Sequence, residues 1–203
     1  MQLLCIERIS LKEIIGGDFD IYRLINLKTS ALVWEDFKIP ASSAQVGPAN
    51  VPGFETYGVT NFATYRFDAA AMEELHFFVQ LPHDWKEGTS LGCHVHWSVP
   101  TTDAWPKTVT WGLEYTWSNI DAAIGASTTI KATKTLTADA DLNKHLMTDL
   151  GFISATGKTM SSMIICRIFR DVASDSYTKD AILLEIDFHY QKDSLGSKQE
   201  KVK

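Results

Sequence analysis

Two histidines, His94 and His96, stand two positions apart in a segment whose neighbouring residues are apolar or small. Alternate side chains of a β-strand lie on the same face, so a strand here would present both imidazoles side by side. His189, in another alternating segment, could join them together with Glu114 or Glu185 if the strands are neighbours. Three histidine or carboxylate ligands with open positions suit Fe, Mn or Zn. These residues are therefore the candidate metal ligands of the chain.

The His-x-His spacing on a predicted strand is similar to the first motif of cupins, which would imply a metal-binding protein or a metalloenzyme using His94, His96 and His189. The cupin pattern expects a glutamate soon after the second histidine, but no carboxylate occurs before Asp103. We therefore favour a structural interpretation. His94 and His96 would line a polar sheet face that packs on another strand layer or another subunit, with hydrogen-bonded ring nitrogens. This interpretation predicts no catalytic residue, no metal and no cofactor.

Carboxylates also alternate on the last predicted strand. Glu185, Asp187 and His189 share its outward face, and a carboxylate pair there could serve as general acid and base. We expect instead that these side chains form ion pairs with Arg167 and Arg170 of the preceding strand. The face would then be a solvated or paired surface rather than an active site.

Other chemical motifs are incomplete. Residues 151–159 place five residues between two glycines where a phosphate loop needs four, and a strand is predicted to follow. Ser161 and Ser162 lack the glycines of a nucleophile elbow. Several tryptophans could form a sugar-stacking platform, although three lie on predicted apolar faces, so most should be core: Trp85, Trp97, Trp105, Trp111 and Trp117. A carbohydrate-binding module for host attachment is thus a further alternative.

The elements that must position these residues are β-strands. Period-two alternation, typical of half-buried strands, is clearest in 91–99, 109–117 and 182–190. Further extended segments are predicted at 32–39, 63–67, 75–81, 128–137, 150–154 and 160–170, with turn signals between them. About eight strands and little helix predict an all-β, jelly-roll-like sandwich.

The chain divides into three parts on this pattern. Residues 1–30 are predicted to form an N-terminal arm or short helix, 31–192 the β-sandwich domain, and 193–203 a polar C-terminal tail. A long loop rich in small residues, glycine and proline is expected at 41–61.

Composition limits the function classes. The 203 residues carry a formal net charge of −6 and no basic stripe, so nucleic-acid binding is not expected. No apolar run is long enough to cross a membrane, and the N-terminus lacks the apolar centre of a signal peptide. Three widely spaced cysteines, Cys5, Cys93 and Cys166, predict reduced thiols, the last two packed as small apolar residues.

Four segments in fixed order resemble a family of tailed-bacteriophage structural proteins: LPHDWKEGTSLGCHVHW, VTWGLEYTWSNI, GKTMSSMIICRIFRD and AILLEIDFHYQKDSLGS. The resemblance spans about residues 32–197. It implies a non-enzymatic virion component made in the bacterial host cytoplasm, such as a capsid decoration (cement) protein or a head, neck or tail part. The implied partners are other virion proteins and further copies of the chain, as a dimer or trimer.

Overall fold

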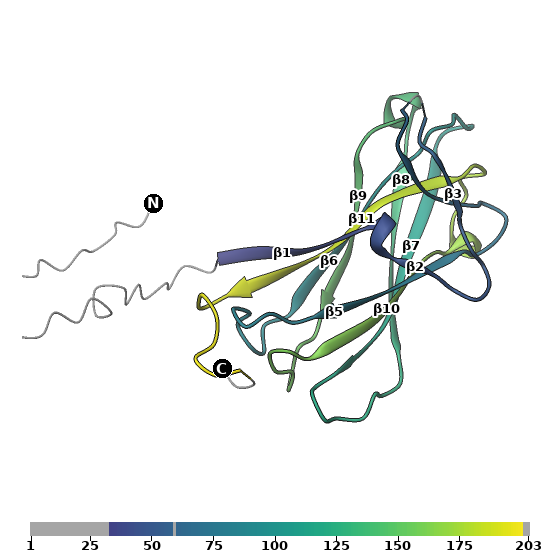
Figure 1. Cartoon of the computed structure of the whole chain (residues 1–203). Helices are drawn as coiled ribbons and strands as arrows, with labels where there is room; N and C mark the ends of the chain where they lie inside the picture. Colours follow the sequence, from purple (N-terminus) through teal and green to yellow (C-terminus); the bar gives the residue numbers. More distant parts are fainter. Residues whose placement is uncertain (1–32, 59, 201–203) are drawn as a thin grey trace, which may run out of the picture. The chain divides into compact units, whose positions relative to one another are not determined.

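The computed structural model describes residues 33–58 and 60–200, and the regular secondary structure of these residues is almost entirely β-strand (Figure 1). Within them lie eleven strands and three short 3-10 turns. The strands are β1 (Val33–Pro40), β2 (Gln45–Val46), β3 (Gly53–Thr56), β4 (Ala63–Phe67), β5 (Glu74–Gln80), β6 (Leu91–Ser98), β7 (Lys107–Ser118), β8 (Thr128–Leu136), β9 (Leu146–Ile153), β10 (Met163–Arg170) and β11 (Ala181–Lys192).

The strands form two antiparallel sheets that pack face to face. Sheet A has the order β3-β4-β11-β6-β9, with β1 also paired to β11, and sheet B has the order β2-β5-β10-β7-β8. The eight strands from β4 to β11 therefore make the rows β4-β11-β6-β9 and β5-β10-β7-β8. These rows are the double Greek key of an eight-stranded jelly roll. The predicted all-β, jelly-roll-like sandwich is confirmed.

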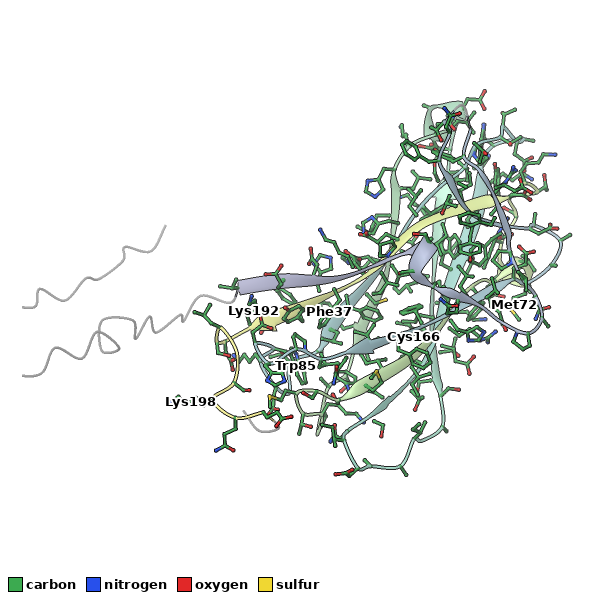
Figure 2. The ribbon with its side chains drawn as sticks, viewed as in Figure 1. Phe37, Met72, Trp85, Cys166, Lys192 and Lys198 are labelled. Carbon is green, nitrogen blue, oxygen red and sulfur yellow. The ribbon has the colours of Figure 1, made fainter. Side chains whose placement is uncertain are left out.

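Side-chain alternation explains how the two sheets close on a core. In β6, Cys93, Val95 and Trp97 are fully buried, as their period-two spacing predicts. Trp97 meets Trp111 of sheet B edge-on across the sandwich, with 6.1 Å between the ring centroids. The Trp97 indole N–H donates to Thr148 Oγ1 at 2.9 Å, so burial of this ring leaves no unpaired donor. Figure 2 draws the side chains on the ribbon and labels Trp85 and Cys166, both of which are buried.

Strand β11 departs from the predicted alternation at a bulge. The register with β6 shifts between Leu183 and Glu185, so two successive residues oppose one on the partner strand. As a result Leu183 is fully buried, whereas Leu184, which the alternation assigned to the apolar face, is half-buried and faces outward. The bulge changes which side chains of β11 reach the outer surface of sheet A.

One local prediction was wrong. The segment 41–61, predicted to be a loop, contains β2 and β3 as well as a 3-10 turn. Residues 68–73, before β5, and 119–124, after β7, contain turns and bends and no helix. Strands β2 and β3 are held by backbone pairing with β5 and β4. The bend after β4 is held by local hydrogen bonds, such as that from the Ala70 N–H to Asp68.

The two chain ends were predicted to be arms. The N-terminal arm or short helix at 1–30 lies outside the described residues. Residues 193–200 of the C-terminal tail contain no helix or strand. Ser197 Oγ lies 2.7 Å from His83 Nδ1, so this part of the tail contacts the sandwich. Among the described residues no helix is long and apolar enough to cross a membrane.

The cysteines of the core are expected to be chemically silent. Cys93 and Cys166 are free and buried, and desolvation raises the pKa of both thiols above their usual range. Because the thiolate is the reactive form, neither residue should be alkylated by iodoacetamide at pH 8 in the native state. Peptide mass spectrometry measures this, with urea-unfolded protein as the control that must show both residues labelled. Labelling of either one in the native protein at the unfolded rate would contradict the packing described.

A network of donors holds the loop between β6 and β7. The backbone N–H and the hydroxyl of Thr178 each donate to Asp103 Oδ2 at 2.8 Å, and the N–H of Ala104 donates to Oδ1. These bonds, led by the Thr178 backbone N–H, lower the pKa of Asp103 to about 2.

The lowered pKa predicts a pH dependence of stability. A carboxyl group with a depressed folded-state pKa stabilises the fold above its unfolded pKa, here 3.8, and loses that effect as the pH falls towards 2. In Asp103→Asn the melting temperature should therefore fall less between pH 5 and pH 2.5 than in the parent protein. The control is Asp121→Asn, whose carboxylate accepts no hydrogen bond from the described residues. Parallel acid profiles for all three proteins would refute the prediction.

Candidate functional site

The three histidines predicted as candidate ligands meet on the outer face of sheet A. His94 and His96 lie on β6, and His189 lies on the neighbouring strand β11. Antiparallel register places Asp187 of β11 opposite His94, and Asp36 of β1 opposite His189. Directly opposed residues in such pairs have Cβ atoms about 4.5–5.5 Å apart, close enough for their polar groups to interact. We call these five side chains together with His145 and Asp149 the His/Asp cluster.

Asp187 is the centre of the His/Asp cluster. Its Oδ2 lies 3.3 Å from His96 Nε2 and 3.1 Å from His189 Nε2, and its Oδ1 lies 3.7 Å from His94 Nδ1. The residue is only 5% exposed, although it projects from the outer face, because the surrounding imidazoles cover it. Three imidazoles from two strands thus surround one buried carboxylate.

A second ring of groups holds the imidazoles from outside. His189 Nδ1 is 2.8 Å from Asp36 Oδ1, and His94 Nε2 is 3.6 Å from Asp149 Oδ1 on β9. His96 Nδ1 is 2.7 Å from Nε2 of His145, which precedes β9. The rings of His94, His96 and His189 therefore each have a polar group near both of their nitrogens.

The His/Asp cluster lines an open groove of about 690 Å³. Besides the cluster residues Asp36, His94, His96, His145, Asp187 and His189, the lining comprises Lys38, Met147, Leu184 and Glu185. The expectation that another strand layer covers this face is not met within the described residues. His94 and His96 keep 21% and 19% of their side chains exposed to the groove.

Three residues expected near this face lie elsewhere. Glu114, considered as a ligand, is on β7 of sheet B, where Arg167 binds it. Arg167 and Arg170, predicted to pair with the carboxylates of β11, pair instead with Glu74 and Glu114 and with Asp175. That prediction was wrong because β10 and β11, although consecutive, belong to different sheets of the jelly roll.

Sequence reasoning missed three members of the cluster, Asp36, His145 and Asp149. They lie on β1, before β9 and on β9, which are far from β6 and β11 along the chain. One signal could have placed a carboxylate on this face. Asp149 follows Met147 by two positions on β9, whose burial alternates, so the two side chains share the outer face of that strand.

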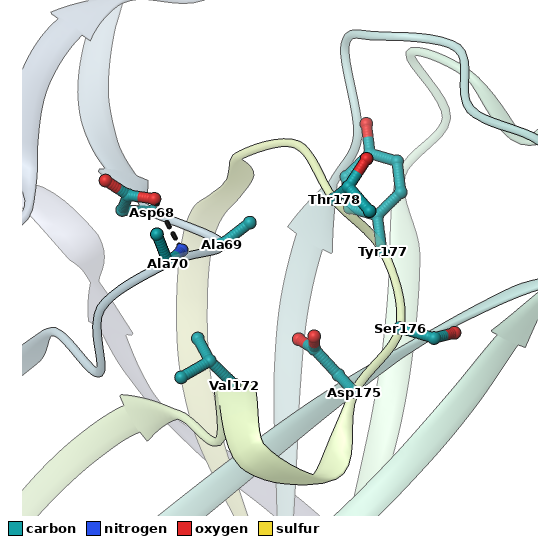
Figure 3. A pocket seen from close by; sticks show the side chains of 8 residues that line it. All are labelled: Asp68, Ala69, Ala70, Val172, Asp175, Ser176, Tyr177 and Thr178. Carbon is teal, nitrogen blue, oxygen red and sulfur yellow. Dashed lines mark hydrogen bonds between the residues drawn. The ribbon is translucent and has the colours of Figure 1, made fainter.

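The other hollow of note, about 310 Å³ in volume, lies beside the loop that follows β10 (Figure 3). Asp68 on its rim accepts a hydrogen bond from the backbone N–H of Ala70 at 2.6 Å. Asp175 is bound by the buried guanidinium of Arg170, and the Tyr177 hydroxyl donates to the Thr101 carbonyl. The polar groups that line this hollow are therefore engaged in holding the loop.

The five tryptophans considered as a stacking platform form none on the described surface. Trp85, Trp97, Trp111 and Trp117 are buried, as predicted for most of them. Trp105 is half-buried and stacks on Tyr177 with an interplanar angle of 7°. Trp34 of β1 is 46% exposed, and the rest of the exposed aromatic surface comes chiefly from phenylalanines, namely Phe62, Phe152, Phe78 and Phe54.

Comparison with known proteins finds likeness in fold only. No protein-family model and no curated protein sequence matches the chain. An isomalto-dextranase of Arthrobacter globiformis T6 aligns at 18% identity and a TM-score of 0.40 over 75% of this chain. The structure of infectious bursal disease virus, Gx strain, aligns at 10% identity and a TM-score of 0.40 over 80% of this chain. The chain spans 23% and 34% of the length of those two chains. The module TmCBM61, solved with β-1,4-galactotriose, aligns at 12% identity and a TM-score of 0.34, covering 78% of this chain and 88% of the module. Likeness this low carries no argument about function.

Proposed function

We propose that this protein is a non-enzymatic structural component of a tailed-phage virion that acts through protein–protein contacts, as a capsid decoration protein or another head, neck or tail part. The observation that carries the proposal is the ordered set of four sequence segments that resemble such proteins. Two of them contain β10 and β11, a third covers β7 from Val109 onward, and the first runs from the residue after β5 into β6. These strands form the central pairs β11-β6 of sheet A and β10-β7 of sheet B. The resemblance thus concerns the part of the fold that builds both sheets.

Exposed aromatic side chains supply the contact surface that this role requires. Phe62 is 80% exposed and Phe54 is 55% exposed, both in the β3–β4 hairpin at one edge of sheet A. Phe152 on β9, at the other edge, is 67% exposed, and Phe78 on β5 of sheet B is 64% exposed. Aromatic residues are enriched at protein interfaces, where their burial contributes a large share of the binding energy. We infer that these phenylalanines contact other copies of the chain or other virion proteins.

Mass spectrometry of gradient-purified phage particles tests the proposal. The protein should remain with the particles through the gradient at a constant ratio to the major capsid protein. Its absence from particles, with abundance in the lysate, would refute a virion role. Light scattering of the purified chain should give the mass of a dimer or trimer. Binding on a glycan array by a monomeric chain absent from particles would favour the carbohydrate-binding alternative instead.

A further inference from the structure

We propose that the outer face of sheet A binds one first-row divalent transition-metal ion, of which Zn²⁺ is the representative, with His94, His96 and Asp187 as ligands. This site goes beyond the proposed virion role and does not depend on it. It also differs from the set suggested by the sequence, because the carboxylate of Asp187 replaces the imidazole of His189.

The separations of the ligand atoms fit such an ion. His96 Nε2 and Asp187 Oδ2 are 3.3 Å apart, and His94 Nδ1 and Asp187 Oδ1 are 3.7 Å apart. One atom from each of the three residues lies within 4.8 Å of the others. Around a tetrahedral Zn²⁺ with bonds of about 2.0–2.1 Å, ligand atoms are about 3.3–3.4 Å apart. Small side-chain rotations therefore bring all three atoms into bonding distance.

Asp187 itself indicates that a cation belongs here. Its Oδ1 is buried and, among the described residues, receives no hydrogen bond. A buried carboxylate oxygen without a donor is unfavourable, and such groups are rare in folded proteins. The oxygen faces the groove on the side of His94, so a metal ion between them would satisfy it.

The surrounding groups hold the two imidazoles as ligands require. A ligating histidine usually donates its far ring N–H to a second group, which fixes the tautomer and the ring orientation. For His96 the group beside the far nitrogen is His145, 2.7 Å from Nδ1. For His94 it is the Asp149 carboxylate, 3.6 Å from Nε2, which is an ion-pair separation rather than a hydrogen bond. Both histidines therefore direct their remaining nitrogen towards Asp187.

Charge and donor type set the class of ion. The groove is lined by three carboxylates, Asp36, Glu185 and Asp187, against a single ammonium group, Lys38. This excess of negative charge favours a cation. Two imidazoles with one carboxylate suit Zn²⁺, Ni²⁺ or Cu²⁺, whereas Mg²⁺ and Ca²⁺ prefer sites made entirely of oxygen. Three protein ligands leave a coordination position open to a water molecule.

Isothermal titration of the untagged full chain with ZnCl₂ tests the proposal. We expect one equivalent of Zn²⁺ to bind per chain, a rise in melting temperature with Zn²⁺, and no response to Mg²⁺ at the same concentration. The double variant His94→Ala/His96→Ala should lose this equivalent, and Asp149→Asn should bind at least about tenfold more weakly because the outer partner of His94 changes. The matched control is His76→Ala on sheet B, which should bind as the parent does.

Two results would overturn the site. One is a parent chain that takes up no Zn²⁺, Ni²⁺ or Cu²⁺ at micromolar concentration. The other is an equivalent of metal that survives in the double variant, which would place binding elsewhere on the chain. Circular dichroism of each variant at 20 °C and in a melt establishes that a loss of binding is not a loss of fold, and Asp187→Asn adds an independent removal of a ligand.

Discussion

Replacing Arg170 by methionine is expected to lower the free energy of unfolding by about 3–5 kcal/mol, the range for removing one partner of a buried ion pair. Arg170 is fully buried, and its Nε donates to Asp175 Oδ2 at 2.7 Å. Its terminal nitrogens donate to the carbonyls of Phe67, Tyr177 and Lys179 at 2.6–3.0 Å. One side chain therefore ties the end of β4 to the loop between β10 and β11.

The physical reason for the large effect is the groups that methionine leaves behind. Asp175 would stay buried without its counter-ion, and three carbonyl oxygens would lose their donors. Burial already raises the pKa of Asp175 despite the neighbouring guanidinium. Without Arg170 the carboxyl group would have to fold in its neutral form or draw water into the loop.

Chemical denaturation of matched variants measures this effect. Arg167→Met is the control, because it makes the same change three residues earlier on β10, at a side chain that is 26% exposed and pairs with Glu74 and Glu114. Partly exposed pairs contribute about 1 kcal/mol or less. Adding Asp175→Asn to Arg170→Met should recover part of the loss, since it removes the unpaired charge. Equal destabilisation by the two methionine variants would contradict the role assigned to Arg170.

The fold could be predicted from residues whose spacing repeats. Cys93, Val95 and Trp97 alternate with His94 and His96, and Trp111 and Leu113 of β7 are spaced by a glycine, so one face of each strand had to be buried. Strands β2 and β3 were missed because both are exposed along their length and bury nothing that a pattern could reveal. Their place in the sheets depends on backbone pairing with β5 and β4.

The His/Asp cluster could be predicted only in part, because it depends on register. That His94 and His96 share a face follows from their spacing, but that Asp187 lies opposite His94 follows from pairing over some ninety residues of chain. The bulge at Leu183–Glu185 sets this register, and no residue type at these positions predicts a bulge. The sequence also does not show which sheet each strand joins. The predicted pairing of β11 with Arg167 was wrong because β10 and β11, although neighbours in sequence, lie in opposite sheets.

Gly112→Ala is expected to destabilise the fold by about 1–3 kcal/mol, the usual effect of overpacking a filled site. Gly112 of β7 pairs with Phe169 of β10, and the Phe169 ring lies directly over the glycine. A β-carbon at position 112 would meet Cε2 and Cε1 of that ring at 2.7 and 2.8 Å, which is too close for carbon atoms. Phe169 is buried, and Lys131 and Arg167 lie over its ring, so the ring can move away from a new β-carbon only by losing these contacts.

Gly92 of β6 provides the matched control, because it occupies a similar outward position on sheet A. A β-carbon there would meet the Phe152 ring at 3.6 Å and His189 Cβ at 3.7 Å, which are ordinary contacts. Gly92→Ala should therefore change the free energy of unfolding by no more than about 0.5 kcal/mol. The double variant Gly112→Ala/Phe169→Ala lacks the ring that the new methyl group would meet. In a double-mutant cycle, Gly112→Ala should therefore not lower the free energy of unfolding when Phe169 is already alanine. If Gly112→Ala is as harmless as Gly92→Ala in denaturant melts, the ring does not rest on the glycine and the outer face of sheet B is packed otherwise.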